Sequence, residues 1–100
     1  MATMSTIAPR EDETSLPKLI GMFMSAAPGV ERVLVASDES ETHVWSIVNN
    51  LAPSGIHQVY ACENVLLSRF PDVSLDFHVV DRRGASPEGL IPGAEIVFGD

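Results

Sequence analysis

Residues 31–50 read ERVLVASDESETHVWSIVNN, and this stretch decides the fold. Two runs rich in β-branched and aromatic residues, Glu31–Ser37 and Thr42–Asn50, flank the short polar link Asp38–Glu41. A short polar link between two such runs is typical of a β-hairpin. The first run contains the uninterrupted apolar segment Val33–Ala36, which predicts a strand that is covered on both faces and lies inside a sheet.

The second hairpin strand divides its side chains between two faces, because successive residues of a strand point to opposite sides. One face carries His43, Trp45 and Ile47, whereas the other carries Val44 and Ser46. The face with Trp45 and Ile47 has the larger apolar area. We therefore expect that face to point toward the helices.

Apolar residues at helical spacing predict one helix before the hairpin and one after it. The first helix spans Leu16–Ala27 and ends at Pro28-Gly29, which turns the chain into the hairpin. A loop at Leu51–Gly55 leads to the second helix, Ile56–Phe70. The apolar stripe of the second helix consists of Ile56, Val59, Tyr60, Cys62, Leu66, Leu67 and Phe70.

Strict alternation predicts a third strand over Val73–Asp81. Its core-facing residues are Val73, Leu75, Phe77 and Val79, and its other face carries Ser74, Asp76, His78 and Val80. After a loop rich in glycine and proline at Arg82–Gly93, the short apolar run Ala94–Phe98 predicts a last edge strand.

This order of elements predicts an α+β fold, a two-layer sandwich with two helices on one face of a three- to four-stranded mixed sheet. We expect a single domain over residues 15–100, preceded by a disordered acidic tail at residues 1–14. The second face of the sheet would stay partly open and carry Val44, Ser46, Asp76 and His78. An open face or edge of this kind invites a protein partner or a second copy of the chain.

Composition limits the kind of partner and the location. The chain of 100 residues has a formal net charge of −8, which argues against binding to nucleic acid or to an anionic membrane. No apolar run is long enough to span a bilayer, and the N-terminal residues do not resemble a signal peptide. Cys62 is the single cysteine, so no intramolecular disulfide can form, and we expect a reducing, cytoplasmic location.

Glu63 is the most unusual residue of the second helix, because it falls in the middle of the apolar stripe. A buried carboxylate needs a partner or takes up a proton. We therefore expect a buried polar pair that fixes the helix against the sheet, with Arg32, His43, His78 and Arg82 as the available partners. One alternative is a pocket in which Glu63, Tyr60, His78 and His43 surround a carboxyl group with a shifted pKa. The other is that the helix is rotated so that Glu63 lies in water.

Asp76 and His78 lie two residues apart on one strand face, a spacing that metal sites use. His43 would join them only if its strand were turned over relative to the assignment above. Two ligands do not make a metal site, so we predict exposed polar residues, no metal and no cofactor. We expect Asp76, together with the basic pair Arg82 and Arg83, to contact a ligand or a partner.

The sequence contains no catalytic motif. There is no Gly-x-Ser-x-Gly, no phosphate-binding glycine loop and no Cys-x-x-Cys, and Cys62 is predicted to be a small buried hydrophobic residue. No catalytic residue is therefore assigned. This favours a non-catalytic interaction or regulatory domain that associates with itself or forms one half of a bacterial-type regulatory pair.

The alternative is a degenerate enzyme that resembles a minimal nucleotidyltransferase in its helix-then-strands layout. Ser37 follows the first strand, as that layout requires, but no glycine precedes it. The second strand has no Asp-x-Asp, and only Asp76 is placed to act as a third carboxylate. Without a pair of carboxylates to hold a metal ion, phosphoryl chemistry has no clamp.

Overall fold

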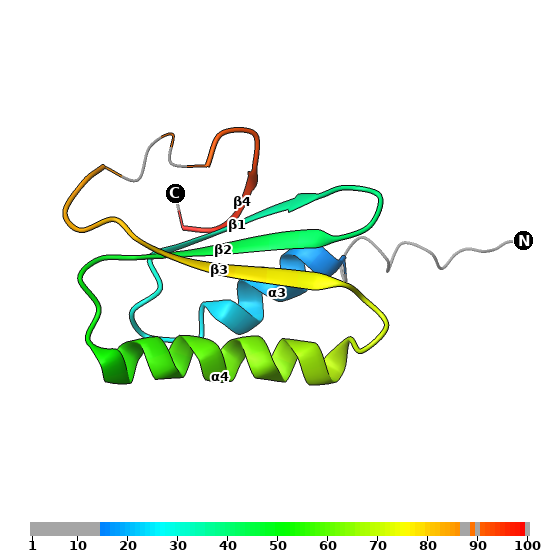
Figure 1. Ribbon diagram of the computed structural model, residues 1–100, viewed down its shortest axis with the longest axis horizontal. Coiled ribbons are helices and arrows are strands. Elements are labelled where there is room, and N and C mark those ends of the chain that lie inside the picture. Colours follow the sequence, from blue (N-terminus) through cyan, green and yellow to red (C-terminus); the bar gives the residue numbers. More distant parts are fainter. Residues whose placement is uncertain (1–14, 87–88, 90, 100) are drawn as a thin grey trace, which may run out of the picture.

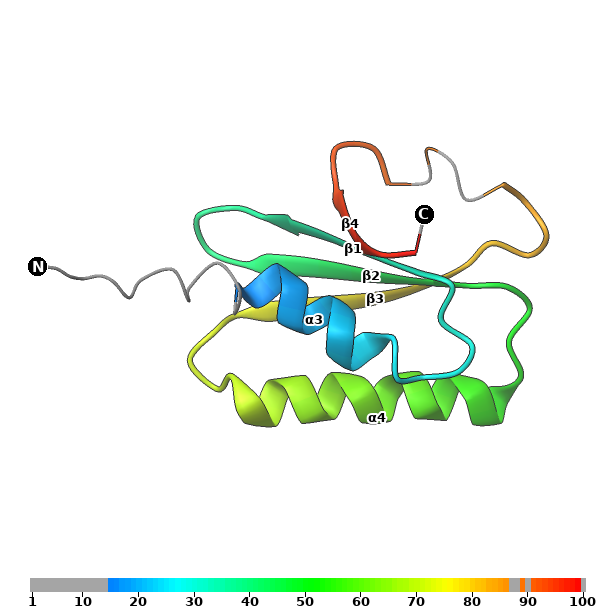
Figure 2. The same cartoon turned by 180° about the vertical axis from the view of Figure 1, so that it is seen from behind.

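The computed structural model describes residues 15–86, 89 and 91–99. The prediction of an acidic tail at residues 1–14 lies outside the described residues. The described elements, in chain order, are α3 (Leu16–Met24), β1 (Arg32–Ser37), β2 (Thr42–Val48), α4 (Pro53–Arg69), β3 (Leu75–Asp81) and β4 (Glu95–Phe98). Figures 1 and 2 show α3 and α4 on the same side of the sheet, so the fold is the predicted two-layer α+β sandwich.

The sheet is mixed and has the strand order β3-β2-β1-β4. β1 pairs antiparallel with β2 in the predicted hairpin, and the turn closes through a 2.9 Å hydrogen bond from Asp38 N to Glu41 O. The chain then crosses over through α4 to lay β3 parallel to β2. β4 pairs antiparallel with β1, with a register shift between Val33 and Leu34. β1 thus lies inside the sheet, as its apolar run predicts.

α4 begins three residues earlier than expected. Pro53 occupies the first helical turn, where its missing N–H and fixed φ cost nothing, so the predicted loop contributes Pro53, Ser54 and Gly55 to the helix. The predicted stripe is also too wide. Val59 and Leu66 are fully buried, whereas Tyr60 and Leu67 are 48% and 44% exposed.

The assignment of faces on β2 was wrong. Val44 and Val48 belong to the core cluster beneath the helices, together with Ile20, Met24, Val59 and Leu66, and Ser46 is buried. Trp45 and Ile47 therefore point to the face that the helices leave open. Apolar area misled the prediction because the open face buries large side chains too. Ile47 is fully buried there, between its cross-strand neighbours Arg32 and Val80.

Three cross-strand rows make up the open face, since residues in register across a sheet share a face. The first row contains Ala36, His43 and Asp76; the second contains Ile96, Leu34, Trp45 and His78; the third contains Arg32, Ile47 and Val80. The prediction that Asp76 and His78 lie on the open face is confirmed. Val44 and Ser46, which were expected beside them, lie on the opposite face.

Candidate functional site

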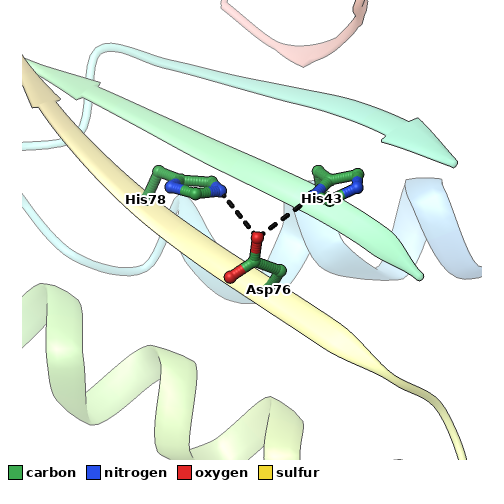
Figure 3. A group of neighbouring side chains, drawn as sticks. All are labelled: His43, Asp76 and His78. Carbon is green, nitrogen blue, oxygen red and sulfur yellow. Dashed lines mark hydrogen bonds and ion pairs between the residues drawn. The ribbon is translucent and has the colours of Figure 1, made fainter.

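His43, Asp76 and His78 form a cluster on the open face, drawn in Figure 3. His43 and Asp76 are register partners on β2 and β3, and His78 follows two residues later on the same face of β3. The Oδ2 atom of Asp76 lies 3.1 Å from His43 Nδ1 and 2.9 Å from His78 Nε2 (Figure 3). One carboxylate oxygen therefore accepts hydrogen bonds from two imidazole rings.

Asp38 extends the cluster into the hairpin turn. His43 Nε2 lies 3.2 Å from Asp38 Oδ2, and the Oδ1 atom of Asp38 accepts hydrogen bonds from the backbone N–H groups of Ser40 and Glu41 at 2.8 Å each. These backbone donors, that of Glu41 first, hold the pKa of Asp38 well below its usual range. The ionised Asp38 carboxylate is thereby fixed on the far side of the His43 ring from Asp76.

The hydrogen bonds to Asp38 and Asp76 raise the pKa of His43 above its ordinary value. Donation from both ring nitrogens at once requires the imidazolium form, which explains the direction of the shift. His43 is therefore more readily protonated than an isolated histidine, and it is held in a fixed orientation between two carboxylates.

Trp45 completes the surface of the site. Its ring stacks on His43 with a centroid distance of 6.0 Å and on His78 with a centroid distance of 5.6 Å. The sequence does place His43 and Trp45 on the same face of their strand. The prediction missed the site because it turned that face toward the helices. Asp38 was missed as well, because its approach to His43 depends on the conformation of the turn.

Glu63 does not form the expected buried pair. Among the described residues it makes no ion pair or hydrogen bond, and its side chain is only partly buried. Desolvation raises the pKa of the Glu63 carboxyl, and the charge of His78 partly opposes that shift. Tyr60 is 48% exposed, and neither of the two hollows described below is lined by Glu63, Tyr60, His78 or His43.

Replacing Glu63 with glutamine is expected to raise the melting temperature at pH 7 by about 1–2 °C, the shift expected for a few tenths of a kcal/mol in a domain of this size. A carboxyl group whose folded pKa is raised favours folding only while it is protonated, so stability falls as the pH rises through that pKa. The gain should vanish near pH 3.5, below the ordinary glutamate pKa of about 4.3. Thermal melts at the two pH values measure it.

Glu39→Gln serves as the control, because Glu39 is exposed in the hairpin turn and this change removes the same charge. An equal rise in both variants would mean that general charge repulsion, not burial of Glu63, is relieved. A lower melting temperature for Glu63→Gln would show that Glu63 has a stabilising partner.

Arg82 and Arg83 occupy different environments. Arg82 donates from Nε to Glu31 at 2.9 Å and from a terminal nitrogen to the Ala85 carbonyl at 2.7 Å, so it tethers the start of the following loop. Arg83 is exposed, and its backbone N–H donates to Asp81. The structure does not bring either arginine to Asp76 through any described contact, and their predicted role as partner contacts stays a prediction.

Two hollows lie on the described surface, and the smaller one borders the site because Asp38 and Glu41 line it. The larger, of 370 Å³, is lined by the start of α3 and by β4, and the smaller, of 270 Å³, is lined by the hairpin turn and by residues 72–74. Neither is lined by a histidine. Burial raises the pKa of the Cys62 thiol, which disfavours a reactive thiolate. No helix in the described part of the chain has the length and apolar character needed to cross a membrane.

Comparisons with protein-family models, with curated proteins and with solved structures gave no match, so the geometry of the site has to support any functional interpretation.

Proposed function

We propose that this chain is a non-catalytic, cytoplasmic interaction domain that pairs with a second copy of itself through the outer edge of β3. The observation that carries the proposal is the exposure of β3. This strand lies at the end of the sheet, and its core-facing side chains are only half-buried. Leu75, Phe77 and Val79 pack against the core on one side and remain accessible on the other.

The backbone of β3 is available for pairing. Thr42 N donates to Ser74 O at one end of the β2–β3 ladder, and Arg82 N donates to Val48 O at the other. In a parallel ladder, every second residue of a strand directs both its N–H and its C=O group toward the neighbouring strand. The even-numbered residues of β3 therefore bond to β2, and the odd-numbered residues direct these groups away from the sheet. An extended strand could add along this edge without disturbing the sheet.

β3 lacks several of the features that usually shield edge strands. Its seven residues include no proline and no lysine, and its register with β2 is regular over the whole strand. β4, at the opposite edge, has only four residues and a register shift. β3 is therefore the better template for a second strand.

One flank of α4 widens this surface. Val59 and Leu66 of α4 belong to the core cluster against which Leu75, Phe77 and Val79 of β3 pack, so α4 covers the helix-facing side of β3. Tyr60 and Leu67 lie one helical turn before and after Glu63, on the same flank, and both are exposed. The edge of β3 therefore offers backbone hydrogen-bonding groups, and the flank of α4 offers apolar side chains beside them.

A second copy is the favoured occupant because one strand can supply both halves of a twofold antiparallel pair. Pairing centred on Val79 would bring Asp76 of each copy opposite Arg82 of the other, since each lies three residues from the centre. Opposite charges directly across a ladder are stabilising. The hydrogen-bonding pattern and the charge pattern of this edge are thus self-complementary.

Introducing a charge on the α4 flank is expected to weaken the dimer. Leu67→Glu would place two carboxylates at the interface, which should shift the dimer dissociation constant by at least about tenfold, since each 1.4 kcal/mol is a factor of ten. Light scattering and sedimentation velocity over a range of protein concentrations measure this.

Val65→Glu provides the matched control. Val65 is 47% exposed, close to the 44% of Leu67, but it lies two residues from Glu63 and so faces the opposite side of α4. This variant should dimerise like the unmodified chain. A protein that stays monomeric at the highest attainable concentration, or variants that behave alike, would overturn the proposal. The nucleotidyltransferase-like alternative stays a prediction, which titration with magnesium and a nucleoside triphosphate would test.

A further inference from the structure

We propose that His43, Asp76 and His78 bind a divalent transition-metal ion, with Zn²⁺ as the ion best suited to two imidazole nitrogens and one carboxylate oxygen. This inference does not depend on pairing of the β3 edges. The three ligand atoms come from neighbouring strands of the sheet and not from a loop (Figure 3).

The ligand atoms are already gathered. They lie within 4.8 Å of one another, and the carboxylate oxygen is 2.9 and 3.1 Å from the two nitrogens. Metal–ligand bonds of about 2.0–2.1 Å in a tetrahedral site place neighbouring ligand atoms roughly 3.4 Å apart. Binding therefore requires only small side-chain adjustments, in which the ion takes the place of the protons shared with Asp76.

Asp38 supplies the outer support that metal-binding histidines commonly have. Coordination through Nδ1 of His43 leaves its Nε2–H to donate to Asp38 Oδ2, at the observed 3.2 Å. The backbone N–H groups of Ser40 and Glu41 fix Asp38 in turn. This carboxylate–histidine pair selects the tautomer with a free Nδ1 lone pair. Asp38 is thus a positioning residue and not a ligand.

The surroundings suit a cation. Trp45 stacks against both imidazole rings and limits their rotation, and the Glu41 carboxylate lies 3.7 Å from His43 Nε2. Asp76 and His78 remain accessible from solvent, so an ion has a path in and a water molecule can complete its coordination.

The test uses the full chain without a histidine tag. Titration calorimetry with ZnCl₂ should show saturation at one ion per chain, and Cu²⁺ should quench Trp45, the single tryptophan. His78→Gln and Asp76→Asn should each weaken Zn²⁺ binding by at least tenfold, and Asp38→Asn by about 10–100-fold. Circular dichroism should show that each variant stays folded.

His57→Gln is the matched control, because His57 is the remaining histidine and is exposed on α4, outside the cluster. It should bind Zn²⁺ as the unmodified chain does. Absence of saturable binding would overturn the proposal, and so would an equal loss of affinity in His57→Gln and His78→Gln, which would indicate diffuse surface binding. An unchanged affinity in Asp38→Asn would overturn the positioning role of that residue.

Discussion

Leu66→Ala is expected to lower the free energy of unfolding by about 3 kcal/mol, within the range of roughly 2–5 kcal/mol for such truncations. Leu66 is fully buried, and it and Val59 are the fully buried residues that seal α4 against the sheet. Removing its side chain loses transfer free energy and leaves a cavity. In a domain of this size the melting temperature should fall by roughly 15 °C, as thermal unfolding followed by circular dichroism would show.

The adjacent Val65→Ala tests the same helix without the cavity. Val65 is 47% exposed, so its truncation should cost less than about 0.5 kcal/mol. Comparable losses in the two variants would mean that α4 is rotated about its axis relative to the structure. A small effect of Leu66→Ala would mean that the core can collapse around the missing side chain.

Gly21→Val is expected to be comparably destabilising, by about 2–3 kcal/mol, although propensity alone slightly favours valine over glycine within a helix. A Cβ atom at Gly21 would lie 2.6 Å from the Val97 carbonyl oxygen, closer than real Cβ contacts allow. The obstacle is backbone, so α3 and β4 would have to move apart. Chemical denaturation measures the loss, and backbone resonances of β4 report the displacement.

Met22→Val separates this clash from the cost of a β-branched residue in the helix. Met22 is the next residue of α3 and is 62% exposed, so only the helix propensity changes, by about 0.5 kcal/mol. If Gly21→Val were no worse than Met22→Val, the close approach of α3 to β4 would be wrong.

Local pattern predicted the type and order of the helices and strands and the architecture, but not every boundary: the first helix was expected to reach Ala27 and ends at Met24. The hairpin, the alternation of Leu75, Phe77 and Val79, and the interior position of β1 are all confirmed, because each depends on neighbours in the sequence. Which face of β2 meets the helices was not predictable from apolar area. Both faces bury large side chains, and the helices contact the smaller Val44 and Val48.

The prediction of the site depended on the same assignment of faces on β2. Asp76 and His78 were found by their spacing, but His43 joins them only because β2 presents its odd-numbered residues to the open face. Glu63 illustrates the opposite error. Helical periodicity placed it correctly beside the buried residues Val59 and Leu66, but periodicity cannot show how much of the Glu63 side chain stays in contact with water.

The position of β4 has a consequence for synthesis on the ribosome. β1 and β2 are neighbours in the sequence, whereas the other edge of β1 is covered by β4, which cannot pair before residues 95–98 have emerged. Until then the nascent chain carries two open edges, those of β1 and β3. Exposed edges in an incomplete sheet promote pairing between chains. Pairing of β4 with β1 therefore removes one of these two open edges, and with it one route to pairing between chains.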